Sequence, residues 1–174
     1  AASDVYKRQP ANLKALSTDY GGTYYNQGTD VSLDGTKLSG YTAADVWTVG
    51  VNSDGSYTFS TADGKKLSMG AKFTSTPLDD VNTAWQLEKA ATSDCFYIKN
   101  TVRGNYLEWY ADKGNWSSFS KIGDEALFAQ AFFKVKESGI ITSLSAGDTV
   151  VIFNPANLKA LSTDLSLIHI SEPT

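Results

Sequence analysis

Apolar and polar residues alternate along most of this 174-residue chain, in short stretches separated by turn residues. β-branched and aromatic residues, which fit a pleated surface, are concentrated in these stretches, for example in residues 48–51, 56–59 and 96–99. Asp-Gly pairs, which suit tight hairpin turns because glycine tolerates a positive φ, occur at residues 34–35, 54–55 and 63–64. Helical pieces are expected only at residues 124–130 and, as a single turn, at residues 42–45. The pattern predicts an all-β fold.

One arrangement of apolar residues recurs three times along the chain. Each copy has an aromatic residue followed by an aliphatic residue two positions later, then a strand-like stretch, then an anchor leucine; the copies are residues 47–67, 85–107 and 133–161. The anchor leucines are 51, 40 and 54 residues apart and are Leu16, Leu67, Leu107 and Leu161. A threefold core needs three equivalent bulky groups, and we expect these to be Trp47, Trp85 and Phe133.

Threefold repetition of a four-strand unit, with a repeat of roughly 40–50 residues, is typical of a β-trefoil. The order of motifs resembles that of ricin-B-type β-trefoil domains over nearly all of residues 10–164. The lectin branch of that family usually carries Gln-x-Trp in each repeat, and the matching triplets here lack the glutamine: residues 45–47, 83–85 and 131–133. The chain also looks like accessory modules of large secreted bacterial proteins. The resemblance implies a β-trefoil-like barrel with three degenerate repeats, secreted or displayed on the cell surface.

Both ends of the chain are expected to be foreign to this domain. Residues 4–9 can be encoded by GAT GTG TAT AAG AGA CAG, and the reverse complement of that string encodes residues 165–170. The relation resembles a sequencing adapter joined to both ends of a DNA fragment, with coincidence as the alternative. We therefore assign residues 1–9 and 165–174 to adapter-derived tails and leave them out of the functional analysis.

A ten-residue segment inside the tails is duplicated, because residues 10–19 recur unchanged as residues 155–164. Tandem domains in a parent protein would explain the repeat, and so would a purely computational closure of the assembled sequence. The internal copies indicate that the natural domain begins near Ser138. We therefore expect residues 10–164 to be one domain, circularly permuted relative to the natural one, with one strand present twice.

Only one copy of the duplicated strand can occupy its place in the sheet. Residues 155–161 can form a local hairpin with residues 149–154, which costs little loop-closure entropy. We therefore expect the C-terminal copy to be in place and residues 10–16 to be displaced.

Composition excludes several classes of function. The formal net charge is −4 and the basic residues are not clustered, which argues against nucleic-acid binding. No apolar run approaches the roughly 18 residues of a membrane span, so membrane insertion is not expected. The single histidine, His169, lies in a tail, which removes Ser-His-Asp and Cys-His catalysis and the commonest zinc ligand. We expect a non-catalytic domain with no cofactor and no bound metal, and Cys95 as a small core residue.

The segment Glu108–Phe119 holds four aromatic residues beside carboxylate and amide groups. Aromatic rings stack on the C–H faces of sugars, while carboxylates and amides bind the hydroxyls. The candidate ligand-binding residues are therefore Trp109, Tyr110, Asp112, Asn115 and Trp116. Alternatively, the two tryptophans cover a gap in the barrel. Residues 20–27, rich in tyrosine and glycine, are a second candidate or an ordinary loop.

The expected function is that of a non-catalytic carbohydrate- or cell-surface-binding module of a larger secreted bacterial protein, with a glycan or surface polysaccharide as partner. A structural or protein-docking domain beside a catalytic domain is the first alternative, and a small glycan-active hydrolase is the second. Exposed Trp109, Tyr110 and Trp116 around a groove would favour binding, and their burial would favour the structural role. Two carboxylates facing each other across a cleft would favour the hydrolase.

Overall fold

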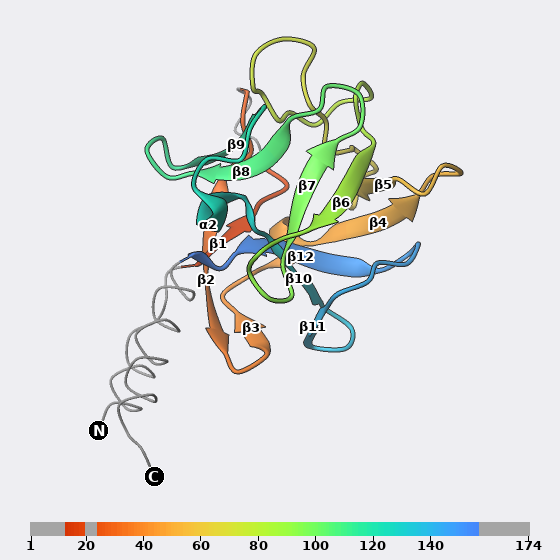
Figure 1. Cartoon of the computed structure of the whole chain (residues 1–174). Coiled ribbons are helices and arrows are strands. Elements are labelled where there is room, and N and C mark those ends of the chain that lie inside the picture. The colour runs from red at the N-terminus through yellow and green to blue at the C-terminus, as the bar shows by residue number, and fades with distance from the viewer. Residues whose placement is uncertain (1–12, 20–23, 157–174) are drawn as a thin grey trace.

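The computed structural model describes residues 13–19 and 24–156, and it confirms the all-β prediction (Figure 1). Twelve strands make up the sheet: β1 (Leu13–Leu16), β2 (Gly28–Asp34), β3 (Lys37–Ser39), β4 (Trp47–Val51), β5 (Tyr57–Ser60), β6 (Trp85–Lys89), β7 (Phe96–Asn100), β8 (Tyr106–Tyr110), β9 (Asn115–Phe119), β10 (Ala131–Lys134), β11 (Gly139–Ile141) and β12 (Thr149–Asn154). The two helical pieces also lie where the sequence predicts them: η1 (Ala43–Asp45), capped by Thr42, and α2 (Glu125–Phe128), capped by Asp124.

The strands pair antiparallel in the order β3-β2-β1-β12-β4-β5-β6-β7-β8-β9, with β10 beside β12 and β11 beside β10. The predicted Asp-Gly turns are confirmed, since all three glycines have positive φ: Gly35, Gly55 and Gly64. Strands from opposite ends of the sequence lie side by side near the centre, where the first strand of the chain runs along the last (Figure 1). In the part of the chain that the structure describes, no helix is both long enough and apolar enough to cross a membrane.

The duplicated strand is the point at which the structure corrects the sequence-based expectation. The N-terminal copy is not displaced: β1 lies between β12 and β2, with Lys14 opposite Asn154 on one side and Asp30 on the other. Leu13, Ala15 and Leu16 are almost completely buried there. Residues 157–164 of the second copy lie outside the described residues. The local hairpin was favoured on loop entropy alone, whereas β1 gains a neighbouring strand on each side and a buried apolar face.

Among the residues that the structure describes, buried side chains form two clusters. The larger contains Trp47 and Trp85, both fully buried as predicted. Phe133 is buried too, but it belongs to the second cluster, whereas its neighbour Phe132 packs with the tryptophans. The expected equivalence of Phe133 with the tryptophans is therefore wrong, because consecutive strand residues point to opposite faces.

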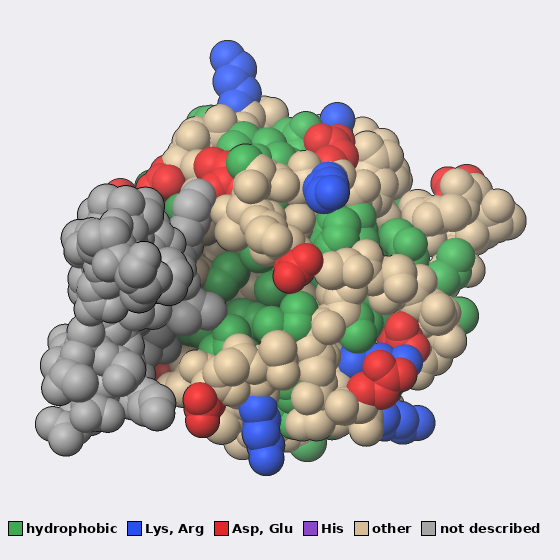
Figure 2. Space-filling model, turned by 60° about the horizontal axis from the view of Figure 1, so that its bottom comes forward, with side chains coloured by type: hydrophobic (Ala, Val, Ile, Leu, Met, Phe, Trp, Pro, Cys, Tyr) green, Lys and Arg blue, Asp and Glu red, His purple; other side chains and the backbone are tan. Residues whose placement is uncertain are grey.

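The second cluster includes residues of the β2–β3 and β10–β11 hairpins, which extend toward the bottom of Figure 1. Figure 2 brings that side forward and shows apolar side chains gathered in a hollow at the centre of the face, with polar and charged groups around them. Partly buried residues packed against the cluster include Leu33, Tyr41 and Ile140.

The duplicated leucines Leu16 and Leu161 provide a matched test of which copy occupies the sheet. Leu16 is fully buried in the larger cluster, so Leu16→Ala should reduce the free energy of unfolding by about 2–5 kcal/mol. Leu161→Ala makes the same chemical change in the other copy and should cost less than about 0.5 kcal/mol, because β1 already fills the position. Urea unfolding of the two variants measures the difference. Equal losses would contradict the assignment of β1.

Candidate functional site

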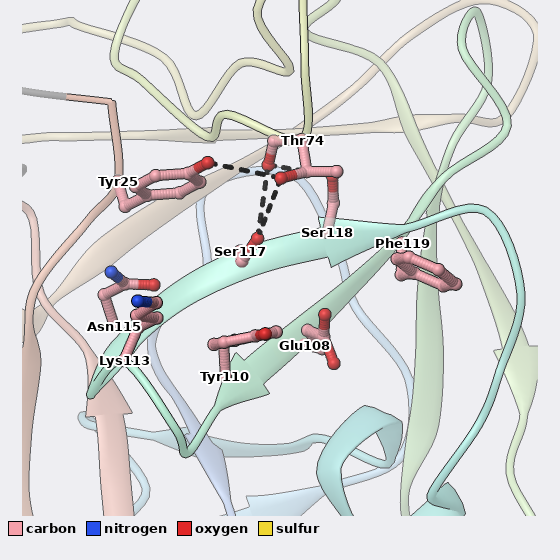
Figure 3. A pocket seen from close by; sticks show the side chains of 9 residues that line it. All are labelled: Tyr25, Thr74, Glu108, Tyr110, Lys113, Asn115, Ser117, Ser118 and Phe119. Carbon is pink, nitrogen blue, oxygen red and sulfur yellow. Dashed lines mark hydrogen bonds between the residues drawn. The ribbon is translucent and has the colours of Figure 1, made fainter.

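A pocket of about 360 Å³ opens on the β8–β9 hairpin (Figure 3). Its lining comes from three parts of the chain that are far apart in sequence: the segment before β2, the connection between β5 and β6, and the hairpin itself. The lining residues are Tyr25, Thr74, Glu108, Tyr110, Lys113, Asn115, Ser117, Ser118 and Phe119.

The alternation of side chains along the hairpin explains how the pocket is made. Leu107 and Trp109 of β8 belong to the core cluster, as does Trp116 of β9. The residues between them point to the other face, which places Glu108 opposite Ser117 and Tyr110 opposite Asn115. One face of the hairpin therefore closes the core while the other supplies pocket residues.

The two tryptophans of the predicted site, Trp109 and Trp116, pack in the core beneath the pocket and do not line it. Trp116 is fully buried and Trp109 is 9% exposed, with their ring centroids 5.6 Å apart in an edge-on arrangement. The Trp116 indole Nε1 donates a hydrogen bond to the Ala15 carbonyl at 3.0 Å. Neither ring offers a free face on which a sugar could stack, so the predicted stacking role for Trp109 and Trp116 is not available in this structure.

Glu108 is the unusual residue of the pocket. Its side chain sits between the rings of Tyr110 and Phe119, and its carboxylate faces the opening (Figure 3). Glu108 is only 7% exposed, yet its carboxylate has no hydrogen-bond or ion-pair partner among the described residues. Burial raises the pKa of this carboxyl above its ordinary value, because the charged form loses hydration without gaining a donor.

The opposite wall is a network of hydroxyl groups. The Tyr25 hydroxyl lies 3.2 Å from Thr74 Oγ1, and Ser117 Oγ donates to the same Thr74 oxygen at 3.2 Å. Ser118 Oγ donates to the Thr74 carbonyl at 3.0 Å. These bonds hold the segment before β2 and the β5–β6 connection against the hairpin, so the wall is ordered before any ligand binds.

The structure brings together only part of the predicted site. Tyr110 and Asn115 line the pocket, while Asp112 is exposed in the hairpin turn and does not line it. The second candidate segment contributes Tyr25, so the two candidate segments meet at one pocket. Of residues 20–27, the first four lie outside the described residues.

Several of the lining residues are not among those predicted from the sequence, Glu108 above all. The alternation of side chains over residues 106–110 could have indicated Glu108, because Leu107 and Trp109 on either side of it point to the core and leave Glu108 on the opposite face. Thr74 comes from an irregular connection and carries no comparable signal in the sequence.

Glu108 is the one carboxylate among the lining residues that the structure describes, whereas hydrolysis of a glycosidic bond uses a facing pair. Across the described residues, no three His, Cys, Asp or Glu side chains are grouped so that they could hold a metal ion. A scan of protein-family models finds none that matches this chain, and a search of curated proteins also finds no match.

Glu108→Gln tests the state of the buried carboxylate through stability. Because its folded pKa is raised, the folded state keeps this proton to a higher pH than the unfolded state does, so rising pH costs the wild type stability. The amide has no charge to bury. The variant should equal the wild type well below the ordinary glutamate pKa and be more stable by on the order of 1 kcal/mol at neutral pH.

Urea unfolding at a series of pH values between acid and neutral measures this difference. Asp112→Asn, at the exposed turn, is the matched control and should change stability by less than about 0.5 kcal/mol at every pH. A Glu108→Gln variant that is less stable than the wild type at neutral pH would show that the carboxylate has a partner.

Proposed function

We propose that this domain is a non-catalytic module that binds carbohydrate, as a free glycan or a cell-surface polysaccharide, in the pocket on the β8–β9 hairpin. The observation that carries the proposal is Glu108, whose side chain is largely buried and whose carboxylate opens into an aromatic-lined pocket without a partner among the described residues. A desolvated carboxylate without a partner is costly, and a donor on a bound ligand would offset that cost.

The rest of the lining suits a polyhydroxylated ring. Tyr25, Tyr110 and Phe119 present aromatic surface, and Asn115 offers both a donor and an acceptor. The hydroxyl wall around Thr74 is held by hydrogen bonds, so little conformational entropy would be lost when a ligand binds. This division between apolar faces and convergent polar groups is typical of small-ligand sites.

A β-trefoil-like barrel with three degenerate repeats remains our proposal for the fold family. Its support is a ring of strand pairings: β4, β5, β6 and β7 follow one another, a bridge joins Phe96 to Gln130 just before β10, and β10 and β12 lead back to β4. Residues in matching positions pair around this ring, namely Tyr57 with Trp85, Phe96 with Gln130, and Val150 with Trp47.

The anchor leucines support the same threefold relation. The Leu16 carbonyl accepts a hydrogen bond from Trp47 Nε1 at 2.8 Å, and the Leu67 carbonyl accepts one from Trp85 Nε1 at 3.0 Å. The Leu107 carbonyl accepts a longer one from Gln130 Nε2, at 3.4 Å. Gln130 therefore occupies in the third copy the position that the tryptophans occupy in the other two.

The origin of the chain is also a proposal. We infer a circularly permuted domain from a larger secreted or surface-displayed bacterial protein, with adapter-derived ends. Residues 1–9 and 165–174 lie outside the described residues.

A structural or docking role is the second candidate function, and the burial of Trp109 and Trp116 favours it. Both rings stabilise the core, as the gap-covering interpretation expects. Large apolar side chains elsewhere are exposed, including Phe73 and Val102, and could contact a neighbouring domain of the parent protein.

A glycan array probed with the full chain separates the two functions. Binding should be reduced about tenfold or more by Tyr110→Ala and by Asn115→Ala, because each removes a pocket contact without opening the core. Asp112→Ala, on the same hairpin but outside the pocket, is the matched control and should bind like the wild type.

Trp116→Ala is unsuitable, since the loss of a fully buried indole costs about 3–5 kcal/mol of stability. A folded chain that binds no glycan, with or without calcium, would favour the docking role.

A further inference from the structure

The charged groups of the pocket are separated. Glu108 lies between Tyr110 and Phe119, whereas Lys113 lies with Asn115 beyond the Tyr110 ring (Figure 3). No ion pair joins Glu108 to Lys113, and Lys113 is the one basic residue among the lining residues that the structure describes. The Glu108 end is therefore a largely desolvated carboxylate that is open to the pocket and has no cation beside it among the described residues.

Neutral hydroxyls would satisfy this site only in part. A hydroxyl donates one hydrogen bond, whereas an ammonium group has three donors and a full positive charge. Hydrogen bonds between two charged groups are roughly twice as strong as those between neutral groups. The aromatic rings on either side of Glu108 add to the effect, because cations are attracted to the faces of such rings.

We propose that the glycan recognised by this pocket carries a free amine, which pairs with the Glu108 carboxylate between Tyr110 and Phe119. This inference rests on the proposed function and names the class of ligand: an amino sugar that is not acylated. The hydroxyl wall and Asn115 favour a sugar over a lysine side chain, because a polyhydroxylated ring can use polar groups along its whole edge.

The test compares two oligosaccharides that differ only at the amine. The full chain is titrated by calorimetry with a glucosamine trimer and with the matching N-acetylglucosamine trimer. We expect the free amine to bind about tenfold more tightly or better. In Glu108→Gln, affinity for the two trimers should come within about twofold, with the affinity for the acetylated trimer little changed. Asp112→Asn, in the exposed hairpin turn outside the pocket, is the control and should keep the wild-type preference.

The outcomes separate this inference from the proposed function. Equal affinity for the two trimers in the wild type, or a preference that persists in Glu108→Gln, would overturn the amine proposal and leave glycan binding standing. A chain that binds neither trimer but binds a lysine-rich peptide would overturn both. Loss of folding does not confuse the result, because Glu108→Gln removes a buried charge and should be at least as stable as the wild type at neutral pH.

Discussion

The placement of one buried indole, Trp116, determines most of what surrounds the pocket. Its Nε1 donates to Ala15, its backbone nitrogen donates to the Asn26 carbonyl, and its own carbonyl accepts from Thr76 Oγ1. Its ring packs edge-on against Trp109. The backbone and side chain of this one residue thus hold Ala15, Asn26 and Thr76 against the hairpin, and polar groups that would be costly to bury alone are satisfied. Because strand side chains alternate, this fixed inner face also fixes the outer face on which the pocket lies.

The same arrangement explains how an unpaired carboxylate is tolerated. A Cβ on Gly28 would come within 2.5 Å of the Trp109 ring, so the inner face of the hairpin is packed directly against a neighbouring backbone, which fixes the strand that carries Glu108. The buried inner face of the hairpin therefore stabilises the fold, while the unpaired Glu108 carboxylate on the outer face reduces the free energy of unfolding. Binding sites commonly show this trade, since a rigid support keeps polar groups ready for a ligand at some cost to the free protein.

Local signals in the sequence predicted local structure well and tertiary placement poorly. The Asp-Gly turns, η1 and α2 follow from residue chemistry within a few positions, and all were predicted. The grouping of Phe133 with Trp47 and Trp85 failed, because two consecutive phenylalanines point to opposite faces of their strand and only Phe132 packs with the tryptophans. The choice of β1 over the identical segment near the C-terminus depends on packing between distant strands, which loop entropy does not describe. The aromatic residues of the β8–β9 segment correctly drew attention to the hairpin that lines the pocket. The sequence did not show that Trp109 and Trp116 are buried in the core while Tyr110 lines the pocket.

The central claim is that Glu108 is an unpaired carboxylate in the free protein and gains its partner from the ligand. Following the ¹³C resonance of the Glu108 carboxyl by NMR through a pH titration tests it most directly, in the free chain and in the chain saturated with the glucosamine trimer. We expect the Glu108 pKa to lie above its ordinary value in the free protein and to fall when the ligand is bound. An ordinary pKa in the free chain, unchanged by the ligand, would contradict it.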